Sequence, residues 1–172
     1  TLSSSSAASD VYKRQIQQFE YLQNHLRILS AFYGILKPMD GVTPYRLEMQ
    51  AKAEIEEKTN LYDYWGDRLY HSVIDDSRTI INLASKEYSK CIERYLSDKD
   101  NYITITFCEL SGDKLVTKGT YAKMARGEMV RFMAENNIEN PVDIQKFDRL
   151  GYTFRGNLSS ETEYVFERKI IK

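Results

Sequence analysis

Three cationic side chains surround one glycine in the stretch TYAKMARGEMVRF, residues 120–132. On a helix with about 100 degrees per residue, Lys123, Arg126 and Arg131 fall within about 140 degrees of arc around Gly127. A glycine inside a helix costs about 1 kcal/mol relative to alanine, so this position needs a reason. The approach of a phosphate would supply one, because both Arg and Lys bind phosphate oxygens. The alternative is a solvated basic face whose glycine admits a neighbouring strand, against which Val130 packs.

A second candidate anion site follows the β-branched run TIINLAS, residues 79–85. The run predicts a strand, and Ser85 at its end can cap a helix over residues 86–95. A strand, a capping serine and a helix also form the local geometry of an anion site, because the first amides of a helix point outward. An ordinary N-cap explains the same pattern.

The overall charge points to no particular partner, because 24 Lys and Arg residues are balanced by 25 Asp and Glu residues. Any electrostatic function must therefore come from local clusters. No apolar run is long enough to span a bilayer, so we predict no membrane partner. The protein is expected to be soluble and intracellular.

The sequence contains no familiar catalytic or metal-binding motif. It has no Walker-type phosphate loop, no GxGxxG after a strand and no GxSxG elbow. Cys91 and Cys108 stand alone, and His25 and His71 lack carboxylates at metal-ligand spacing. We therefore predict no cofactor and no metal, assign no catalytic residue, and expect both cysteines to be buried thiols in a reducing compartment.

The first fifteen residues, TLSSSSAASDVYKRQ, are rich in Ser and Ala and show no apolar periodicity. We expect residues 1–15 to be a non-native or disordered tail outside the fold, similar to translated adapter DNA. The folded domain is expected over residues 16–172 and incomplete at its N-terminus.

Apolar periodicity and turn residues predict the elements that position these side chains. The first half is predicted to form a helix at 16–29, a buried strand at 30–38, an extended stretch at 45–49, a helix at 60–76 capped by Asn60, a strand at 79–85 and a helix at 86–95. The second half is predicted to form strands at 102–110 and 114–122, the helix with the basic motif, a helix from Asn140 to Gly151, and a strand pair at 152–156 and 163–171.

The irregular order of helices and strands predicts the fold class. Short turns join several neighbouring strands, which argues against a regular parallel sheet. The expected architecture is α+β (mixed α/β), a mixed β-sheet with helices packed on it. On the basic helix, the predicted core face consists of Ala122, Ala125, Met129, Phe132 and Met133.

Six strings in this chain resemble the YaaA family of bacterial peroxide stress proteins. They occur in the family's order across about residues 16–169 and are LRILSAFYGILKPMDGVTPYRLEM, NLYDYWGD, IINLASKEY, YAKMARGEMVRFM, FDRLGYTF and EYVFERK. The resemblance departs at the front, where the tail replaces the family's N-terminal portion with its short strand and lysine-bearing motif. The expected fold is therefore YaaA-like without that portion.

The resemblance implies a cytoplasmic protein that protects cells from hydrogen peroxide and is associated with iron homeostasis and the limiting of DNA damage. It also implies a positively charged cleft that binds DNA. We take irregular or damaged duplex DNA as the expected partner. An uncharacterised enzyme acting on a nucleotide or nucleobase in the same cleft is the alternative, whereas direct iron binding is disfavoured because the histidines and cysteines are isolated.

The resemblance also carries over a set of site residues from the matched motifs: Tyr33, Arg46, Glu48, Asn82, Ser85, Tyr121, Lys123, Arg126, Gly127 and Arg131. Within this set we predict that Lys123, Arg126 and Arg131 contact phosphates and that Arg46 joins them. Glu48 is expected to hold Arg46 in an ion pair, the alternative being a general acid or base. The others are expected to support the cleft.

Overall fold

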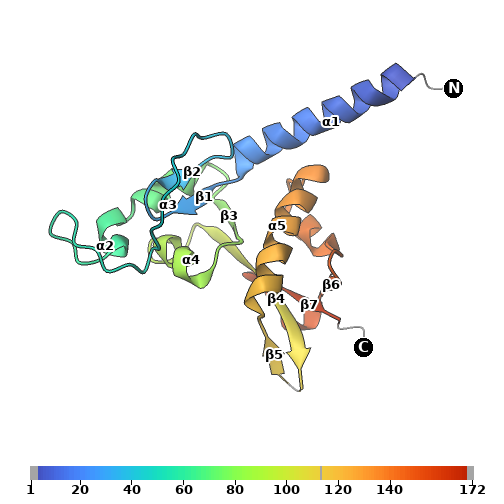
Figure 1. Ribbon diagram of the computed structural model, residues 1–172. Helices are drawn as coiled ribbons and strands as arrows, with labels where there is room; N and C mark the ends of the chain where they lie inside the picture. Colours follow the sequence, from blue (N-terminus) through green and yellow to red (C-terminus); the bar gives the residue numbers. More distant parts are fainter. Residues whose placement is uncertain (1–3, 113, 170–172) are drawn as a thin grey trace. The chain divides into compact units, whose positions relative to one another are not determined.

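The computed structural model describes residues 4–112 and 114–169, and the chain divides into two compact units. Unit 1 consists of the chain up to Leu26, Thr106–Ser159 and the chain from Tyr164 onward. Unit 2 consists of Arg27–Ile105 and Ser160–Glu163. Strand β4 (Asn101–Ser111) contributes its first half to unit 2 and its second half to unit 1. Figure 1 shows the order of the elements along the chain.

Helix α1 (Ser4–His25) begins well before the predicted start at residue 16 and ends before residue 29. The expected start was wrong because the Ser- and Ala-rich stretch contains no Gly or Pro that would stop a helix. Whether residues 1–15 are foreign to the natural protein stays a prediction.

The stretch predicted as one buried strand at 30–38 is a hairpin. Strands β1 (Ile28–Ser30) and β2 (Gly34–Leu36) pair antiparallel. The chain reverses because Gly34 adopts a φ of +80°, a conformation that L side chains rarely adopt. A Cβ on Gly34 would also lie 2.9 Å from two ring atoms of Trp65. Both the turn and the close packing therefore require glycine here.

Gly34→Ala is expected to lower the free energy of unfolding by about 2–4 kcal/mol, because it adds both backbone strain and overpacking. Urea unfolding followed by circular dichroism measures the change. Gly41→Ala is the matched control, because no atom lies within 4 Å of a Cβ built at Gly41. Equal stability of the two variants would show that Trp65 and the backbone adapt freely.

The predicted helix at 60–76 is divided into α2 (Leu61–Trp65) and α3 (Arg68–Val73). Its predicted cap is confirmed, because Asn60 Oδ1 accepts a hydrogen bond of 2.9 Å from the Asp63 N–H. The division occurs at Gly66, which has a φ of +55° and ends α2. Before α2, a long irregular segment follows β2 and is visible as the teal trace in Figure 1.

Strand β3 (Thr79–Asn82) and helix α4 (Lys86–Glu93) of unit 2 agree closely with the sequence predictions. Strand β3 pairs parallel with the start of β4, and helix α4 follows. The predicted extended stretch at 45–49 forms no regular strand, although Leu47 and Met49 turn inward as expected. The main cluster of buried core residues in unit 2 consists of Ala31, Met49, Leu61, Leu69, Tyr70, Cys91 and Ile92.

In unit 1, strand β5 (Lys114–Val116) pairs antiparallel with the end of β4. The predicted strand at 114–122 is too long, because α5 (Gly119–Glu135) already begins at Gly119. From Ala122 onward the sequence is rich in strong helix formers, Ala, Met, Arg, Glu and Lys, which explains the early start.

After α5 the chain forms a short 3₁₀ helix, η1 (Pro141–Lys146), instead of the predicted helix to Gly151. Asn140 caps it as expected, but the backbone becomes extended at Phe147, whose side chain is buried. Strand β6 (Tyr152–Phe154), the 3₁₀ turn η2 (Gly156–Leu158) and strand β7 (Glu163–Arg168) follow. The predicted strand pair is confirmed by β6 and β7, which pair antiparallel; residues 170 and 171 of the predicted strand lie outside the described residues.

The predicted core face of α5 is confirmed. Ala122, Ala125, Met129 and Phe132 are buried, and Met133 is half-buried. The Phe132 ring packs edge-on against Phe147, with 5.5 Å between ring centroids, and Phe147 packs against Phe166 at 5.7 Å. This aromatic core fixes the rotation of α5 and therefore decides which of its residues face away from the core.

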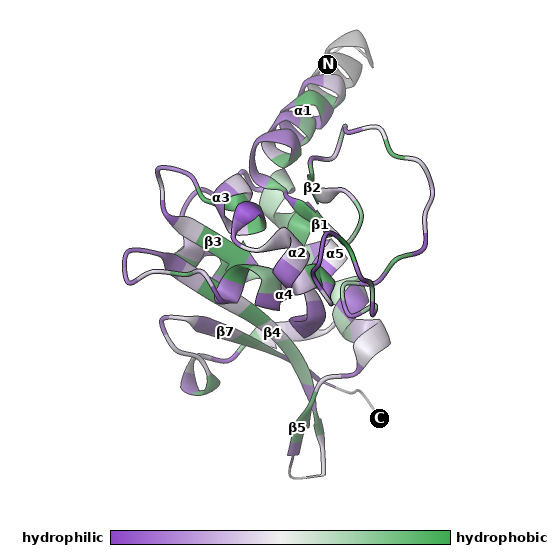
Figure 2. Ribbon diagram, turned by 90° about the vertical axis from the view of Figure 1, so that its left-hand side faces the viewer, coloured by the Kyte–Doolittle hydropathy of each residue, from purple (hydrophilic) through white to green (hydrophobic). Residues whose placement is uncertain are grey.

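The fold class is α+β with a mixed sheet, as predicted. The strand order is β3-β4-β7-β6, with β5 pairing with β4 outside this row. Figure 2 colours β4 largely green, in line with its buried Ile103, Ile105 and Phe107. None of the helices in the described part of the chain is long and apolar enough to cross a membrane.

Candidate functional site

Arg126 on α5 is a partly buried cation that forms no ion pair with the described residues. Its Nε atom is buried and makes no hydrogen bond. Burial lowers the pKa of the Arg126 guanidinium below its ordinary value, and no carboxylate among the described residues offsets this effect. The group nevertheless stays charged, because arginine titrates far above neutral pH. A charge withdrawn from water without a counter-ion raises the free energy of the folded state, so an anion beside Arg126 would be stabilising.

Lys123 and Gly127 lie on the same helix and are both exposed. No described atom lies within 4 Å of a Cβ built at Gly127. The alternative in which this glycine admits a neighbouring strand is therefore wrong for the described residues. The open space at Gly127 would let a ligand come close to the helix backbone.

Arg131, the third predicted cation, belongs to a network of charges. Its Nε donates a hydrogen bond of 2.7 Å to Glu135 Oε1, and Glu128 lies 3.9 Å away. Arg149 donates to the same two carboxylates, at 2.5 Å from Glu135 and 3.4 Å from Glu128. The hydrogen bond with Glu135 raises the pKa of Arg131. These partners give Arg131 a structural role, while its predicted phosphate contact stays a prediction.

A buried carboxylate joins two cations near the start of α5. The Glu109 side chain is only 1% exposed, and its Oε2 accepts hydrogen bonds from Arg168 Nη2 at 2.8 Å and Nε at 3.1 Å. Lys118 forms an ion pair with the other oxygen. The hydrogen bond from Lys118, followed by that from Arg168, holds the pKa of Glu109 below its ordinary value. The Arg168 guanidinium lies over the ring of Tyr121, 3.6 Å from its centroid.

Sequence reasoning included Tyr121 but missed Glu109, Lys118 and Arg168. One signal was available, because Glu109 continues the inward-facing alternation of Ile105 and Phe107 on β4. A carboxylate at such a position needs cationic partners, since an unpaired buried charge is strongly unfavourable.

The predicted residues of unit 2 form no ion pair with one another. Arg46 and Glu48 are both exposed, and none of the ion pairs within the described residues joins them, so the expected pairing is wrong. Residues two apart share one side only in a regular strand, and the backbone at 45–49 is irregular. The Tyr33 hydroxyl accepts a 2.8 Å hydrogen bond from the Thr43 N–H and braces the loop. Because Arg46 lies in unit 2 and α5 in unit 1, their predicted convergence stays a prediction.

Asn82 and Ser85 lie at the turn between β3 and α4. Asn82 is buried, and its Oδ1 accepts a 3.0 Å hydrogen bond from the Ala84 N–H. Ser85 occupies the N-cap position with extended backbone, but its side chain makes no capping hydrogen bond. The predicted side-chain cap is therefore wrong, because the Ser85 hydroxyl accepts from none of the first amides of α4.

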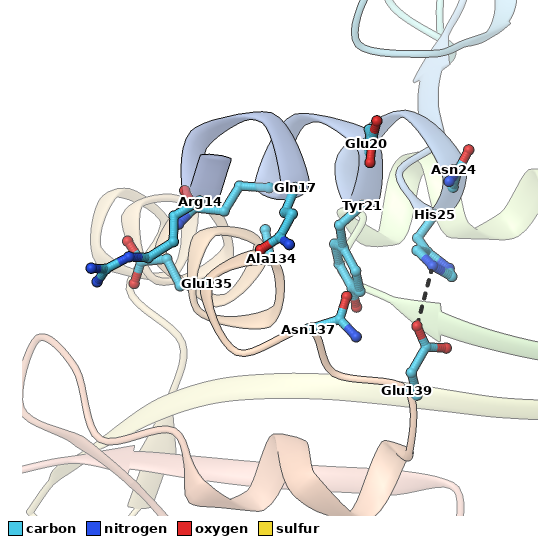
Figure 3. A pocket seen from close by; sticks show the side chains of 11 residues that line it. Arg14, Gln17, Glu20, Tyr21, Asn24, His25, Ala134, Glu135, Asn137 and Glu139 are labelled. Atoms are coloured by element: carbon cyan, nitrogen blue, oxygen red, sulfur yellow. Dashed lines mark ion pairs between the residues drawn. The ribbon is translucent and has the colours of Figure 1, made fainter. Parts of the chain in front are cut away.

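A cavity of about 480 Å³ lies between α1 and the end of α5 in unit 1. Figure 3 shows His25 and Glu139 facing each other in it, 3.8 Å apart. Tyr21 donates a 2.7 Å hydrogen bond to the Ile138 carbonyl, and burial raises the pKa of Tyr21 to about 12. None of the predicted site residues lines this cavity. Residues 4–112 and 114–169 contain no cluster of three His, Cys, Asp or Glu residues that could hold a metal ion.

The two cysteines are buried, as predicted. Burial raises the pKa of the Cys91 thiol to about 11. The Cys108 thiol lies 3.6 Å from the Phe166 carbonyl. The thiolate is the reactive form of cysteine, so a redox-active thiol has a lowered pKa, whereas the pKa of Cys91 is raised.

The fold is that of a mixed α+β protein, and its helix α5 carries cationic side chains that carboxylates neutralise only in part. Comparison with known proteins then identifies its family: the chain belongs to the family described as Peroxide stress protein YaaA, which it matches over residues 8–158. The resemblance seen in the sequence motifs is thus confirmed.

Several curated relatives named UPF0246 protein are highly similar to this chain. The relative from Agathobacter rectalis is 80% identical over 153 residues, which cover 89% of this chain and 61% of the relative. The relative from Lachnoclostridium phytofermentans is 57% identical, with coverage of 87% and 58%, and that from Desulfitobacterium hafniense is 55% identical, with coverage of 86% and 59%. The chain therefore spans about three fifths of the length of these relatives.

Proposed function

We propose that this peroxide stress protein binds DNA through the phosphate backbone and so helps to limit iron-dependent DNA damage in the cytoplasm. The observation that carries the proposal is Arg126, a partly buried arginine whose charge no described residue neutralises. Its nearest positive neighbour along the helix, Lys123, lies one turn away and is exposed. A phosphate beside Arg126 would supply the missing counter-charge.

The chemistry of this helix face suits the backbone of DNA better than its bases. Arginine offers a planar fork for phosphate oxygens, and lysine offers a mobile point charge. Such contacts hold a duplex without reading its sequence. The open space at Gly127 supports the proposal, because a sugar-phosphate chain can approach the helix where no side chain intervenes.

Charge reversal of the two helix cations tests the proposal. A labelled duplex is titrated at two salt concentrations with the wild-type chain and with Lys123→Glu/Arg126→Glu, and binding is followed by fluorescence anisotropy. We expect weaker binding and a log-log salt dependence that is shallower by roughly 0.9 for each phosphate that the variant no longer neutralises.

The matched control is Lys99→Glu/Lys114→Glu, which changes the net charge equally at two exposed lysines, one just before β4 and one on β5. This variant is expected to keep most of the wild-type salt dependence. Equal losses of affinity in both double variants would assign binding to overall charge instead of the α5 face. If the folded wild-type chain does not bind the duplex, the proposal is wrong, and an enzyme acting on a small phosphorylated substrate is favoured instead.

A further inference from the structure

Three aromatic rings, two of them exposed and one half-buried, form a cluster at the surface of unit 2. Phe32 is 58% exposed and Tyr45 is 42% exposed. Their ring centroids lie 5.3 Å apart, with 32° between the ring planes. Tyr33 packs edge-on against both rings, at 4.9 Å from Phe32 and 5.6 Å from Tyr45. We call Phe32, Tyr33 and Tyr45 the aromatic platform.

Hydrogen bonds hold Tyr33 and Tyr45 of the platform in place, and the Phe32 ring packs against both. The buried Ser30 Oγ lies 2.5 Å from the Tyr45 hydroxyl and accepts a 2.9 Å hydrogen bond from the Tyr33 N–H. The Tyr33 hydroxyl accepts from the Thr43 N–H. Because the Tyr33 and Tyr45 hydroxyls are engaged with the protein, these two rings are oriented before any ligand arrives, which lowers the entropy lost on binding.

Packing does not explain the platform. Neither the main cluster of buried core residues in unit 2 nor the half-buried apolar residues packed against it include Phe32, Tyr33 or Tyr45. A group of aromatic rings at the surface is a feature of binding surfaces more than of a core. Arg46 follows Tyr45 directly in the chain, is exposed, and makes no ion pair within the described residues.

We propose that the aromatic platform stacks an unpaired nucleobase and that Arg46 contacts a phosphate next to that base. This inference rests on the proposed DNA binding and names the part of the DNA that unit 2 would recognise. Aromatic rings beside a free cation are the combination that single-stranded nucleic acid requires, because every base has a π-face and every nucleotide carries a negative charge. A purely apolar partner would use the rings but would leave Arg46 without a counter-ion.

The test compares two labelled duplexes of the same length, one fully paired and one with a central bubble that contains 2-aminopurine. The full chain is titrated into each as wild type, Phe32→Leu and Phe32→Trp, after a thermal melt confirms folding. Leucine keeps the apolar character of the exposed position but removes the ring, whereas tryptophan keeps a ring. Anisotropy reports affinity, and 2-aminopurine quenching reports stacking of the base.

The wild-type chain is expected to bind the bubble more tightly than the paired duplex and to quench 2-aminopurine. Phe32→Leu is expected to lose roughly five-fold or more of the bubble affinity while keeping duplex affinity, and Phe32→Trp to restore it. Wild-type duplex binding without bubble preference or quenching would overturn this inference alone. Binding to neither DNA would overturn the proposed function as well. In a further outcome, Phe32→Leu binds the bubble as tightly as wild type does. If size-exclusion chromatography then shows that wild type is a dimer and Phe32→Leu is not, the platform is a contact between copies of the chain.

Discussion

Replacement of Arg126 by methionine is expected to weaken duplex binding about ten-fold without destabilising the protein. The affinity falls because a charge-assisted hydrogen bond to phosphate contributes roughly 1.5–3 kcal/mol. The free energy of unfolding should stay within about 1 kcal/mol of wild type or rise, because methionine removes an unpaired charge from a half-buried position that solvent still partly screens. Methionine is also unbranched and a good helix former, so α5 should be preserved. Urea unfolding and anisotropy at one salt concentration measure the two effects.

Arg131→Met is the matched control on the same helix. Arg131 bonds to Glu135 and lies close to Glu128, so its removal is expected to lower the melting temperature. Arg131→Met should weaken duplex binding less than Arg126→Met does, because the charge of Arg131 is already paired with Glu135. A large loss of stability in Arg126→Met would indicate that Arg126 serves the fold and not a ligand.

The second large effect is expected for Glu109→Gln. This change leaves Lys118 and Arg168 without the buried carboxylate that neutralises them. Loss of one member of a buried charge cluster is strongly destabilising, and the melting temperature should fall by about 10 °C. Glu161→Gln removes an exposed carboxylate and serves as the control. Equal melting temperatures for the two variants would show that the Glu109 cluster contributes little to unit 1.

The same cluster predicts a pH dependence. The pKa of Glu109 is lower in the folded protein than in the unfolded chain, mainly through the hydrogen bond from Lys118. Its contribution to stability is therefore complete above the unfolded pKa, about 4.3, and is lost as the pH falls through the folded pKa. Wild type should lose more stability than Glu109→Gln over this acid range. Parallel pH profiles would assign acid unfolding to other carboxylates.

Local patterns in the sequence were sufficient to predict which side of the basic helix faces the core. The 3.6-residue period placed Ala122, Ala125 and Met129 in the core and the cations away from it, because both follow from the geometry of one helix. The partners of Arg131 were also within reach, since Glu128 and Glu135 lie three and four residues away on the same helix. Only the contribution of Arg149 required the tertiary fold.

The rest depended on backbone conformations and on residues distant in sequence. A φ of +80° at Gly34 turns an apolar run into a hairpin, and this isolated glycine was the only signal in the run that separates one strand from two short ones. Glu109 meets Arg168 across 59 residues, so the pair becomes visible only once β4 and β7 are neighbours. The aromatic platform likewise depends on an irregular loop that brings Tyr45 to Phe32.

The salt dependence of duplex binding by wild type and Arg126→Met tests the central claim most directly. If Arg126 neutralises a phosphate, the log-log slope of the variant should be shallower than that of wild type by roughly 0.9. If the two proteins bind with the same affinity and the same slope, Arg126 touches no phosphate and the α5 face is not the DNA site.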